Sequence, residues 1–335
     1  MINGYYVMEM QHHFIPSEAI KFMGETREHD YGFGLKRYRA AYDRMGDIDT
    51  HLRFMDESGI DMAVLSTGAF TPNGYEFCRS CNDGYGMVVK NHPDRFQGMI
   101  HIYPFDKDKN KDEVKRAVEE LGLWGIALAS SYGFDEETTM DSGIMDRIYG
   151  MAVTYGMPVY IHPPMRRQLW GGQRYDLFTT MSREYDTVKA LVEILYGVLP
   201  RFPELKVIAA HFGGGLPALK GRLLAWHQPD NFDIEDRGFG RSTEEAKELG
   251  LVENFELLCK NMLFDSAGYG GWMPVIQSAF EALGPYHICF GTDYPYELNK
   301  PAYTKRLIED ITKLDWDEGY KRSFLSENLS TFFRK

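Results

Sequence analysis

The stretch MEMQHHFIP, residues 8–16, carries three consecutive polar side chains, Gln11, His12 and His13, at the end of a segment with strand character. Side chains two positions apart on a β-strand share a face, so Gln11 and His13 point to one side and His12 points to the other. In sheets of parallel strands, the side chains that bind ligands gather beyond the carboxyl ends of the strands. We therefore expect residues 8–16 to hold the first strand and the first part of a functional site.

Further segments rich in apolar and β-branched residues follow along the chain, separated by longer amphipathic segments. This alternation is typical of strands that alternate with helices. The predicted strands span residues 6–11, 62–67, 97–103, 124–129, 158–162, 206–210, 262–266 and 287–292. Gly59, Gly122 and Gly156 each follow a helical segment and precede a strand, as C-cap glycines do. Eight such units predict an α/β fold, a (β/α)8 TIM barrel, formed by residues 1–335 as a single domain.

The net charge of −12 argues against a nucleic acid or an anionic membrane as a partner, because both need a basic face. An anionic small molecule remains open, since a metal and one or two local cations hold a carboxylate whatever the overall charge. No apolar run approaches the ~20 residues that span a bilayer, and the N-terminus lacks the pattern of a secretory leader. The scattered cysteines then indicate a reduced, cytoplasmic protein, in which Cys78 and Cys81 are helical positions one turn apart rather than a metal or redox site.

Two segments exceed the minimal repeat of strand and helix, and both leave from the carboxyl ends of predicted strands. The first insertion spans residues 20–44, after strand one, and the second spans residues 165–186, after strand five. Barrel enzymes place substrate contacts in such loops, and long ones serve as lids or specificity elements. Surface decoration or an oligomer contact is the alternative that the sequence leaves open.

Three later strands also end in a polar side chain. His162 comes after the apolar run of the fifth strand, His211 after that of the sixth and Asp293 after that of the eighth. A single histidine at a strand end is more commonly a structural residue than a ligand. Three histidines, counting His13, and one aspartate at equivalent strand ends instead predict convergence, because the strand ends of a barrel ring one mouth. Imidazole and carboxylate suit zinc and similar divalent ions, and three protein ligands plus water form the catalytic arrangement.

Taken together, these strand ends resemble the amidohydrolase superfamily. More narrowly they resemble its amidohydrolase-2 branch, which contains 2-amino-3-carboxymuconate-6-semialdehyde decarboxylase and the hydroxybenzoate decarboxylases. The resemblance spans nearly the whole chain and is carried by HFIP at 13–16, HP at 162–163, HFGG at 211–214 and GTDYP at 291–295, and by MDESGID at 55–61, PDRF at 93–96 and RFP at 201–203. It implies a divalent metal cofactor, with zinc favoured and manganese as the alternative.

Carried over position by position, the resemblance makes His13, His162 and Asp293 metal ligands. His211 becomes the histidine that polarises the substrate or activates water beside the metal. The family begins with His-x-His, or Glu-x-His in some decarboxylases, whereas this chain has Gln11 as the first member. A glutamine carbonyl ligates metals more weakly than imidazole or carboxylate. We favour Gln11 as ligand or near-ligand over His12, because strand alternation turns His12 away.

Three functions fit these residues. The first is a metal-dependent decarboxylase, a carboxy-lyase of an aromatic or ring-cleavage-derived carboxylic acid, in which His211 or Asp293 delivers a proton to carbon. The second is a metal-dependent hydrolase of a carbon-carbon bond in a meta-cleavage product, or of a lactone or amide, in which Asp293 takes a proton from water. The third is a barrel that has lost catalysis and binds a metabolite or partner.

The expected partner is a small-molecule carboxylic acid. Arginine side chains bind carboxylates bidentately, and aromatic faces suit a conjugated substrate. The predicted substrate-binding residues are Arg39, which is the nearest match to an arginine of the family's first insertion, and Trp170, Arg174, Phe212 and Tyr294. By analogy with related barrels we also expect a homo-oligomer, most simply a dimer.

Overall fold

The computed structural model describes residues 1–23, 42, 44–133, 138–164, 175, 177–227, 242–249 and 255–333. In these residues parallel strands form two hydrogen-bonded ladders, with the orders β10-β1-β2-β3 and β4-β5-β6-β7-β8-β9. The strands are β1 (Met8–His12), β2 (Met62–Leu65), β3 (Phe96–Gly98), β4 (Ile100–His101), β5 (Ile126–Ala129), β6 (Pro158–His162), β7 (Lys206–Ala209), β8 (Met262–Asp265), β9 (Ile288–Cys289) and β10 (Gly291–Tyr294).

The two ladders are parts of one ring, because the third and eighth predicted strands are each divided in two. Met99 donates its N–H to Leu65 at 3.1 Å, and the next residue, Ile100, donates to Gly125 at 2.8 Å, so the chain passes from one ladder to the other within one residue. Phe290 makes the second junction between β9 and β10, and its carbonyl accepts from Met10 at 2.8 Å. The predicted (β/α)8 barrel is therefore the fold, and the two divided strands were predicted as continuous.

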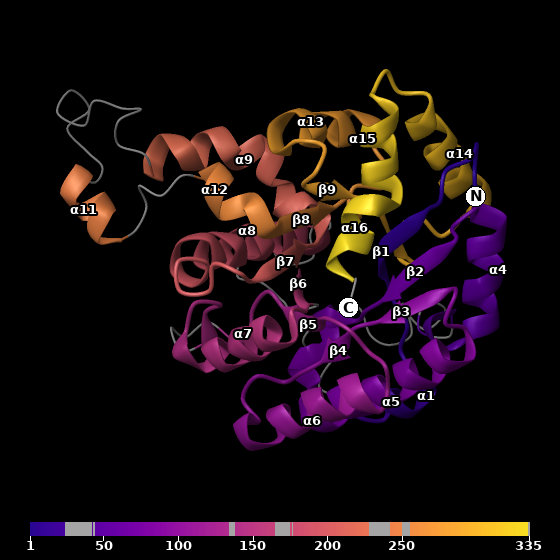
Figure 1. The fold of residues 1–335 in the computed structure, drawn as a ribbon, viewed down its shortest axis with the longest axis horizontal. Helices are drawn as coiled ribbons and strands as arrows, with labels where there is room; N and C mark the ends of the chain where they lie inside the picture. The colour runs from indigo at the N-terminus through magenta and orange to yellow at the C-terminus, as the bar shows by residue number, and fades with distance from the viewer. Residues whose placement is uncertain are drawn as a thin grey trace.

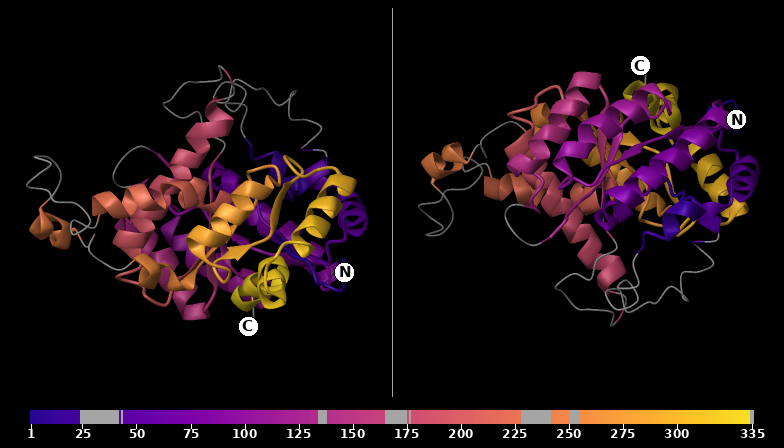
Figure 2. Two further views of the ribbon diagram at one scale, coloured as in Figure 1. Left: turned by 90° about the horizontal axis from the view of Figure 1, so that it is seen from above. Right: turned by 90° about the horizontal axis from the view of Figure 1, so that it is seen from below.

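Helices surround the strands on the outside (Figure 1). Helix α14 (Pro301–Thr312) packs against α4 (Ile48–Ser58), so segments far apart in the sequence lie side by side. Helix α11 lies apart from the other helices in Figures 1 and 2. The α-helices are α1 (Ser17–Ile20), α4 (Ile48–Ser58), α5 (Tyr75–Asn91), α6 (Lys107–Glu119), α7 (Gly143–Tyr155), α8 (Arg183–Glu193), α9 (His211–His227), α11 (Thr243–Glu248), α12 (Phe255–Leu258), α13 (Met273–Leu283), α14 (Pro301–Thr312), α15 (Glu318–Arg322) and α16 (Asn328–Phe332).

Short 3-10 and π segments join or extend several helices: η1 (Gly68–Asn73), η4 (Phe178–Ser182), η5 (Ile194–Val198), η7 (Cys259–Asn261) and η8 (Ser323–Glu327). The second predicted insertion, 165–186, therefore ends in regular structure, because η4 leads directly into α8. Residues 212–215, at the start of α9, all have positive φ, so the regular part of that helix begins after them. His211, which directly precedes this left-handed turn, also has a positive φ, of 57°.

Local side-chain and backbone signals account for both ends of α4. Asp47 accepts hydrogen bonds from the N–H groups of Asp49 and Thr50, which caps the first turn of α4. Gly59 ends the same helix with φ of 78°, in the left-handed region where a Cβ is unfavourable. Cys78 and Cys81 are buried on α5 and unbonded to each other, which confirms the helical prediction for this pair.

The interior of the barrel is apolar at its centre and polar at one end. All five residues of β1 and all five of β6 are buried, so both faces of these strands are covered. Strands buried on both faces have nearly continuous apolar sequences, so a polar residue within one of them is easily identified from the sequence. Within the described residues, no helix combines the length and apolar character that crossing a bilayer demands.

Candidate metal centre

Three of the predicted ligands meet at the carboxyl end of the barrel. His13 follows β1, His162 is the last residue of β6, and Asp293 lies in β10. One ligand atom of each residue lies within 4.8 Å of the others. The side chains are 1%, 1% and 2% exposed, so water contributes little to solvating them. A group of two imidazoles and one carboxylate is thus assembled from strands that are far apart in the sequence.

The hydrogen bonds of the two imidazoles determine which nitrogen faces the centre. Nδ1 of His13 lies 2.8 Å from the carbonyl oxygen of Ser66, and Nδ1 of His162 lies 2.9 Å from that of Pro163. A carbonyl oxygen only accepts, so each Nδ1 carries the hydrogen and each neutral ring presents a lone pair at Nε2. These lone pairs and the carboxylate of Asp293 converge without a hydrogen between them, and this donor set fits a divalent cation.

Burial alone would raise the pKa of the Asp293 carboxyl. Without a metal, a second proton on His13 supplies a hydrogen bond and a positive charge that hold this pKa below its ordinary value. Oδ1 of Asp293 lies 2.8 Å from Nε2 of His13. The carboxylate therefore stays ionised in a site that excludes water. Tyr296 stands beside this pair, with its ring centroid 5.5 Å from that of His13.

His211 lies beside the cluster, with its ring centroid 5.3 Å from that of His162. Its Nδ1 lies 2.8 Å from Oε1 of Glu184, a carboxylate of α8. Burial by itself lowers the pKa of His211, but the charge and hydrogen bond of Glu184 outweigh it and raise the pKa to about 9. Gly268 leaves room for the ring, because a Cβ there would lie 2.4 Å from Cγ of His211. Glu184 thus orients an imidazole that holds a proton readily.

Gln11 faces the same centre. Its φ is 67°, an unusual backbone conformation for glutamine, and its side chain is fully buried. Nε2 of Gln11 lies 3.1 Å from Nε2 of His162 and 2.9 Å from Nε2 of His211. Its Oε1 lies 2.9 Å from the hydroxyl of Tyr160.

His12 points to the opposite side of β1, as strand alternation predicts. Its Nδ1 pairs with the carboxyl group of Glu9, and its Nε2 lies 2.7 Å from Nδ1 of His51. Nε2 of His51 donates to the carbonyl of Arg44 at 2.9 Å, so Nδ1 of His51 accepts and Nε2 of His12 donates. A neutral His12 therefore needs a proton from Glu9. Burial raises the pKa of Glu9 to about 8 and lowers that of His12 to about 3, which matches this pattern.

Helix α8 brings an arginine to the rim of the site. Arg183 directly precedes Glu184, and its Nε is buried with no hydrogen-bond partner among the described residues. Burial and then the charge of His13 are the main causes that lower the pKa of His162, whereas burial raises the pKa of Asp293 and His13 lowers it. The positive charge of Arg183 makes a smaller contribution that lowers both pKa values. Asp186 fixes this end of the helix, because it accepts a hydrogen bond from Ser131 at 2.9 Å.

The predicted substrate contacts have different locations. Arg39, Trp170 and Arg174 lie outside the described residues. Phe212 is fully buried in the core, with its ring centroid 6.1 Å from that of Tyr269. Tyr294 stacks on Phe54 with centroids 3.9 Å apart, and it lies on the His12 side of β1. Contact of these residues with substrate stays a prediction, and the rings of Phe212 and Tyr294 pack against protein.

Three residues of the site were not singled out from the sequence. Tyr160 precedes His162 by two positions and so shares its face of β6, a signal that strand alternation offered. Asp265 is the last residue of the otherwise apolar strand β8, so the search for polar side chains at strand ends could have found it. Glu184 lies on a helix that follows an insertion, and nothing local distinguishes it from a solvated glutamate.

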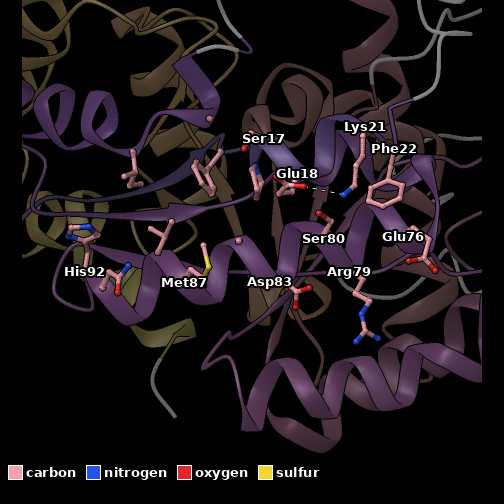
Figure 3. Close-up of a pocket in the computed structure, with 17 residues that line it drawn as sticks. Ser17, Glu18, Lys21, Phe22, Glu76, Arg79, Ser80, Asp83, Met87 and His92 are labelled. Carbon is pink, nitrogen blue, oxygen red and sulfur yellow. Dashed lines mark hydrogen bonds and ion pairs between the residues drawn. The ribbon is translucent and has the colours of Figure 1, made fainter.

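Surface grooves lie elsewhere. A groove of about 610 Å³ runs along α5 beside α1, and Figure 3 shows its lining side chains. Its charges are largely paired, since Lys21 bonds Glu18 at 3.1 Å and Asp83 bonds Arg116 at 2.7 Å. A second groove of about 650 Å³ separates α6 from α7. Neither groove is lined by the converging imidazoles and carboxylate of the barrel mouth.

Comparison with known proteins places these features in a family. The family model described as amidohydrolase matches residues 8–334. The gamma-resorcylate decarboxylase of Rhodococcus jostii is 27% identical over 280 residues, which cover 76% of this chain and 79% of that protein. The 2-amino-3-carboxymuconate-6-semialdehyde decarboxylase of Dictyostelium discoideum is 25% identical over 308 residues, which cover 89% of this chain and 79% of that protein.

Solved structures agree with the fold. A 2,6-dihydroxybenzoate decarboxylase in complex with 2,6-dihydroxybenzoate has a TM-score of 0.76 and 21% identity, and the match covers 98% of this chain and 99% of that one. A 5-carboxyvanillate decarboxylase from Novosphingobium aromaticivorans with bound manganese also has a TM-score of 0.76 and 21% identity, with 98% and 97% covered. Since the family model spans nearly the entire sequence, the chain belongs to the amidohydrolase family.

Proposed function

We propose that this protein is a metal-dependent decarboxylase of an aromatic carboxylic acid. The observation that carries the proposal is the convergence of His13, His162 and Asp293, with two imidazole lone pairs aimed at one carboxylate. The relatives described above are decarboxylases of aromatic or muconate-derived acids, which supports this reaction over hydrolysis.

The residues that would hold the metal are His13, His162 and Asp293, with Gln11 beside them. When bound, a divalent cation would supply positive charge that binds the oxygens of a hydroxy-carboxylate and stabilises negative charge on the substrate. Manganese is present in the 5-carboxyvanillate decarboxylase, which supports it as the first candidate. Zinc, which imidazole ligands also suit, is the alternative. Elemental analysis of the purified protein distinguishes the two.

In the proposed reaction, a proton is added to the ring carbon that bears the carboxylate. The bond between that carbon and the carboxylate then breaks, carbon dioxide leaves, and the electron pair of that bond restores the aromatic ring. We assign proton delivery to Nε2 of His211, because Nδ1 of the same ring is bonded to Glu184 and Nε2 faces the centre. The Glu184 carboxylate keeps His211 protonated although the ring is buried, so a proton is present at Nε2 for transfer to the substrate.

Substrate binding is assigned to positive and aromatic side chains at the mouth. Arg183 is the described arginine whose buried Nε has no partner in the described part of the chain, and a guanidinium there suits a carboxylate or phenolate oxygen. Arg39, Trp170 and Arg174 remain proposed contacts from the two insertions. A homodimer and a cytoplasmic location also stay predictions.

The test is a product analysis with the full-length protein and added Mn²⁺. Hydroxybenzoic acids with a hydroxyl beside the carboxylate, including 2,6-dihydroxybenzoate, are the first substrates to supply. We expect stoichiometric carbon dioxide and the corresponding phenol. In D₂O the phenol should carry one deuterium at the carbon that lost the carboxylate. Transfer of ¹⁸O from water into a new carboxylate, without carbon dioxide, would identify a hydrolase instead.

A further inference from the structure

Tyr160 lies between two oxygen atoms that both accept hydrogen bonds. Its hydroxyl is 2.9 Å from Oε1 of Gln11 and 3.0 Å from Oδ2 of Asp265. All three side chains are fully buried, so water does not supply a substitute partner. A phenol has one hydrogen, and it therefore donates to only one of these two oxygens.

Asp265 is the stronger competitor for that hydrogen. Its other oxygen, Oδ1, accepts from the N–H groups of His211 and Ala267, each at 3.1 Å, which holds the carboxylate in one orientation. Hydrogen bonds to an ionised carboxylate are roughly twice as strong as those to a neutral amide. With the hydrogen of Tyr160 given to Asp265, the phenol oxygen faces Gln11 as an acceptor. The group of Gln11 that suits this position is its NH₂.

The other end of the Gln11 amide faces Nε2 of His162 and of His211. Since Nδ1 of His162 donates to a carbonyl, Nε2 of that ring carries a lone pair. An amide NH₂ in this position donates to the lone pair when no cation is present. A carbonyl oxygen in the same position becomes a further ligand when a cation is present. The two orientations interchange oxygen and nitrogen at nearly constant volume, so the packing tolerates both.

We propose that Tyr160 and Asp265 are positioning residues that turn the carbonyl oxygen of Gln11 toward a divalent cation held by His13, His162 and Asp293. In this arrangement Asp265 accepts from Tyr160, and Tyr160 accepts from the NH₂ of Gln11. One lone pair of Oε1 of Gln11 is left to the metal, and the other accepts from the protonated Nε2 of His211. The inference rests on the metal centre of the proposed function and is independent of which reaction the enzyme catalyses. This arrangement explains how the neutral side chain of Gln11 acts as a metal ligand, because a glutamine whose amide is not held in one orientation binds a cation weakly.

The test measures metal affinity in Tyr160→Phe, which removes the hydroxyl and keeps the ring. Purified full-length protein is titrated with Mn²⁺ and, separately, Zn²⁺ in chelator-buffered solution. Partners that orient a metal ligand typically change affinity by about 10–100-fold, and we expect a weakening of this size. The matched control is Tyr149→Phe, because Tyr149 is equally buried and its hydroxyl makes one hydrogen bond, to the carbonyl of Met140 at 2.7 Å. We expect the control to bind metal as the wild type does.

Asp265→Asn is the second variant. An asparagine NH₂ directed at Tyr160 would send the hydrogen of the phenol to Oε1 of Gln11 and leave the NH₂ of Gln11 facing the metal. Metal affinity should therefore fall although Tyr160 is intact. Thermal unfolding of each variant without metal checks that it folds and allows the metal-dependent rise in midpoint to be compared with the wild type.

A double-mutant comparison in the Gln11→Leu background decides whether Tyr160 acts through Gln11. Gln11→Leu alone should weaken binding, and adding Tyr160→Phe should then change the affinity no further. Independent, multiplying losses would overturn the inference, as would wild-type affinity in Tyr160→Phe. If the affinities follow the proposal while no substrate releases carbon dioxide, the proposed reaction fails and the metal-positioning role stands.

Discussion

Nε2 of His13 lies 2.8 Å from Oδ1 of Asp293, while Nδ1 of the same imidazole is bonded to the carbonyl of Ser66. With a neutral ring, two acceptor atoms face each other in a buried site. Such a contact is favourable only when a cation lies between or beside the two atoms, either a proton on the imidazole or a divalent metal. The packing of β1 against β10 thus builds a site that requires positive charge.

The first prediction concerns this pair. Asp293→Asn keeps the shape of the side chain and lets its NH₂ donate to Nε2 of His13, so the metal-free variant should be at least as stable as the metal-free wild type. Its activity should fall about 10²–10⁴-fold, since it loses a charged ligand at the reacting centre. Thermal unfolding with and without Mn²⁺, together with initial rates, measures both effects. Full activity of exhaustively chelated wild type would contradict the assignment.

The second prediction concerns the partner of His211. Glu184→Gln retains a hydrogen-bonding group but removes the negative charge that stabilises the protonated ring. We expect kcat to fall about 10–100-fold with a smaller change in KM, because the variant alters a catalytic imidazole and not a substrate contact. Glu281→Gln, at an exposed position on α13, is the matched control and should behave as wild type. Equal rates for the two variants would remove Glu184 from the mechanism.

The third prediction concerns Arg183. If its guanidinium binds the substrate carboxylate, Arg183→Gln loses a charged hydrogen bond of about 1.5–3 kcal/mol, which corresponds to an increase in KM of about 10–150-fold. Arg183→Lys should recover part of the loss, because it keeps the charge and loses the planar fork. Steady-state kinetics with one hydroxybenzoate substrate distinguishes the variants. Arg306→Gln provides an exposed control, and a KM for Arg183→Gln equal to that of this control would exclude the contact.

The fourth prediction concerns the dependence of stability on pH. His101 is fully buried, its Nε2 accepts from the N–H of Thr67 at 2.9 Å, and burial lowers its pKa to about 3. The unfolded chain takes up a proton at this residue near its ordinary pKa of 6.5, whereas the folded chain takes it up only near pH 3. The contribution of His101 is therefore present above pH 6.5 and is lost on acidification, by about 1.4 kcal/mol per pH unit.

Urea unfolding of wild type and His101→Gln between about pH 7.5 and pH 4.5 measures this difference, because this range crosses the unfolded-state pKa of 6.5 and stays above the folded-state value of about 3. The variant should be less stable at the upper end of the range, because the imidazole packs and bonds better than the amide. Its free energy of unfolding should then fall less steeply as the pH is lowered. Parallel pH profiles for the two proteins would contradict the prediction, because they would show that His101 takes up its proton at the same pH in the folded and the unfolded chain.

Much of the fold follows from patterns that are local along the chain. The C-cap predicted at Gly59 ends α4 as expected, because a cap acts on adjacent backbone groups. Strand β6 was also predicted with its observed limits, since an apolar run bounded by proline and a polar end is a local signal. The division of the third and eighth strands was not predicted, because it depends on which neighbouring strand accepts each N–H group.

The site also has features that local patterns predict and features that depend on contacts between distant segments. From the sequence alone, alternation of side chains along a strand predicted that Gln11 and His13 face one side of the first strand and His12 the other. The structure has the same division, although Gln11 has a φ of 67° and the register of β1 shifts between Met10 and His12, so the alternation is interrupted there. Only the tertiary structure decided that Glu184 reaches His211 and that Tyr160 lies between Gln11 and Asp265. These partners come from different strands and a helix, and their distances depend on how the strands of the barrel and the helix pack. Local backbone preferences determine on which face a side chain lies, whereas packing between distant segments determines what it touches.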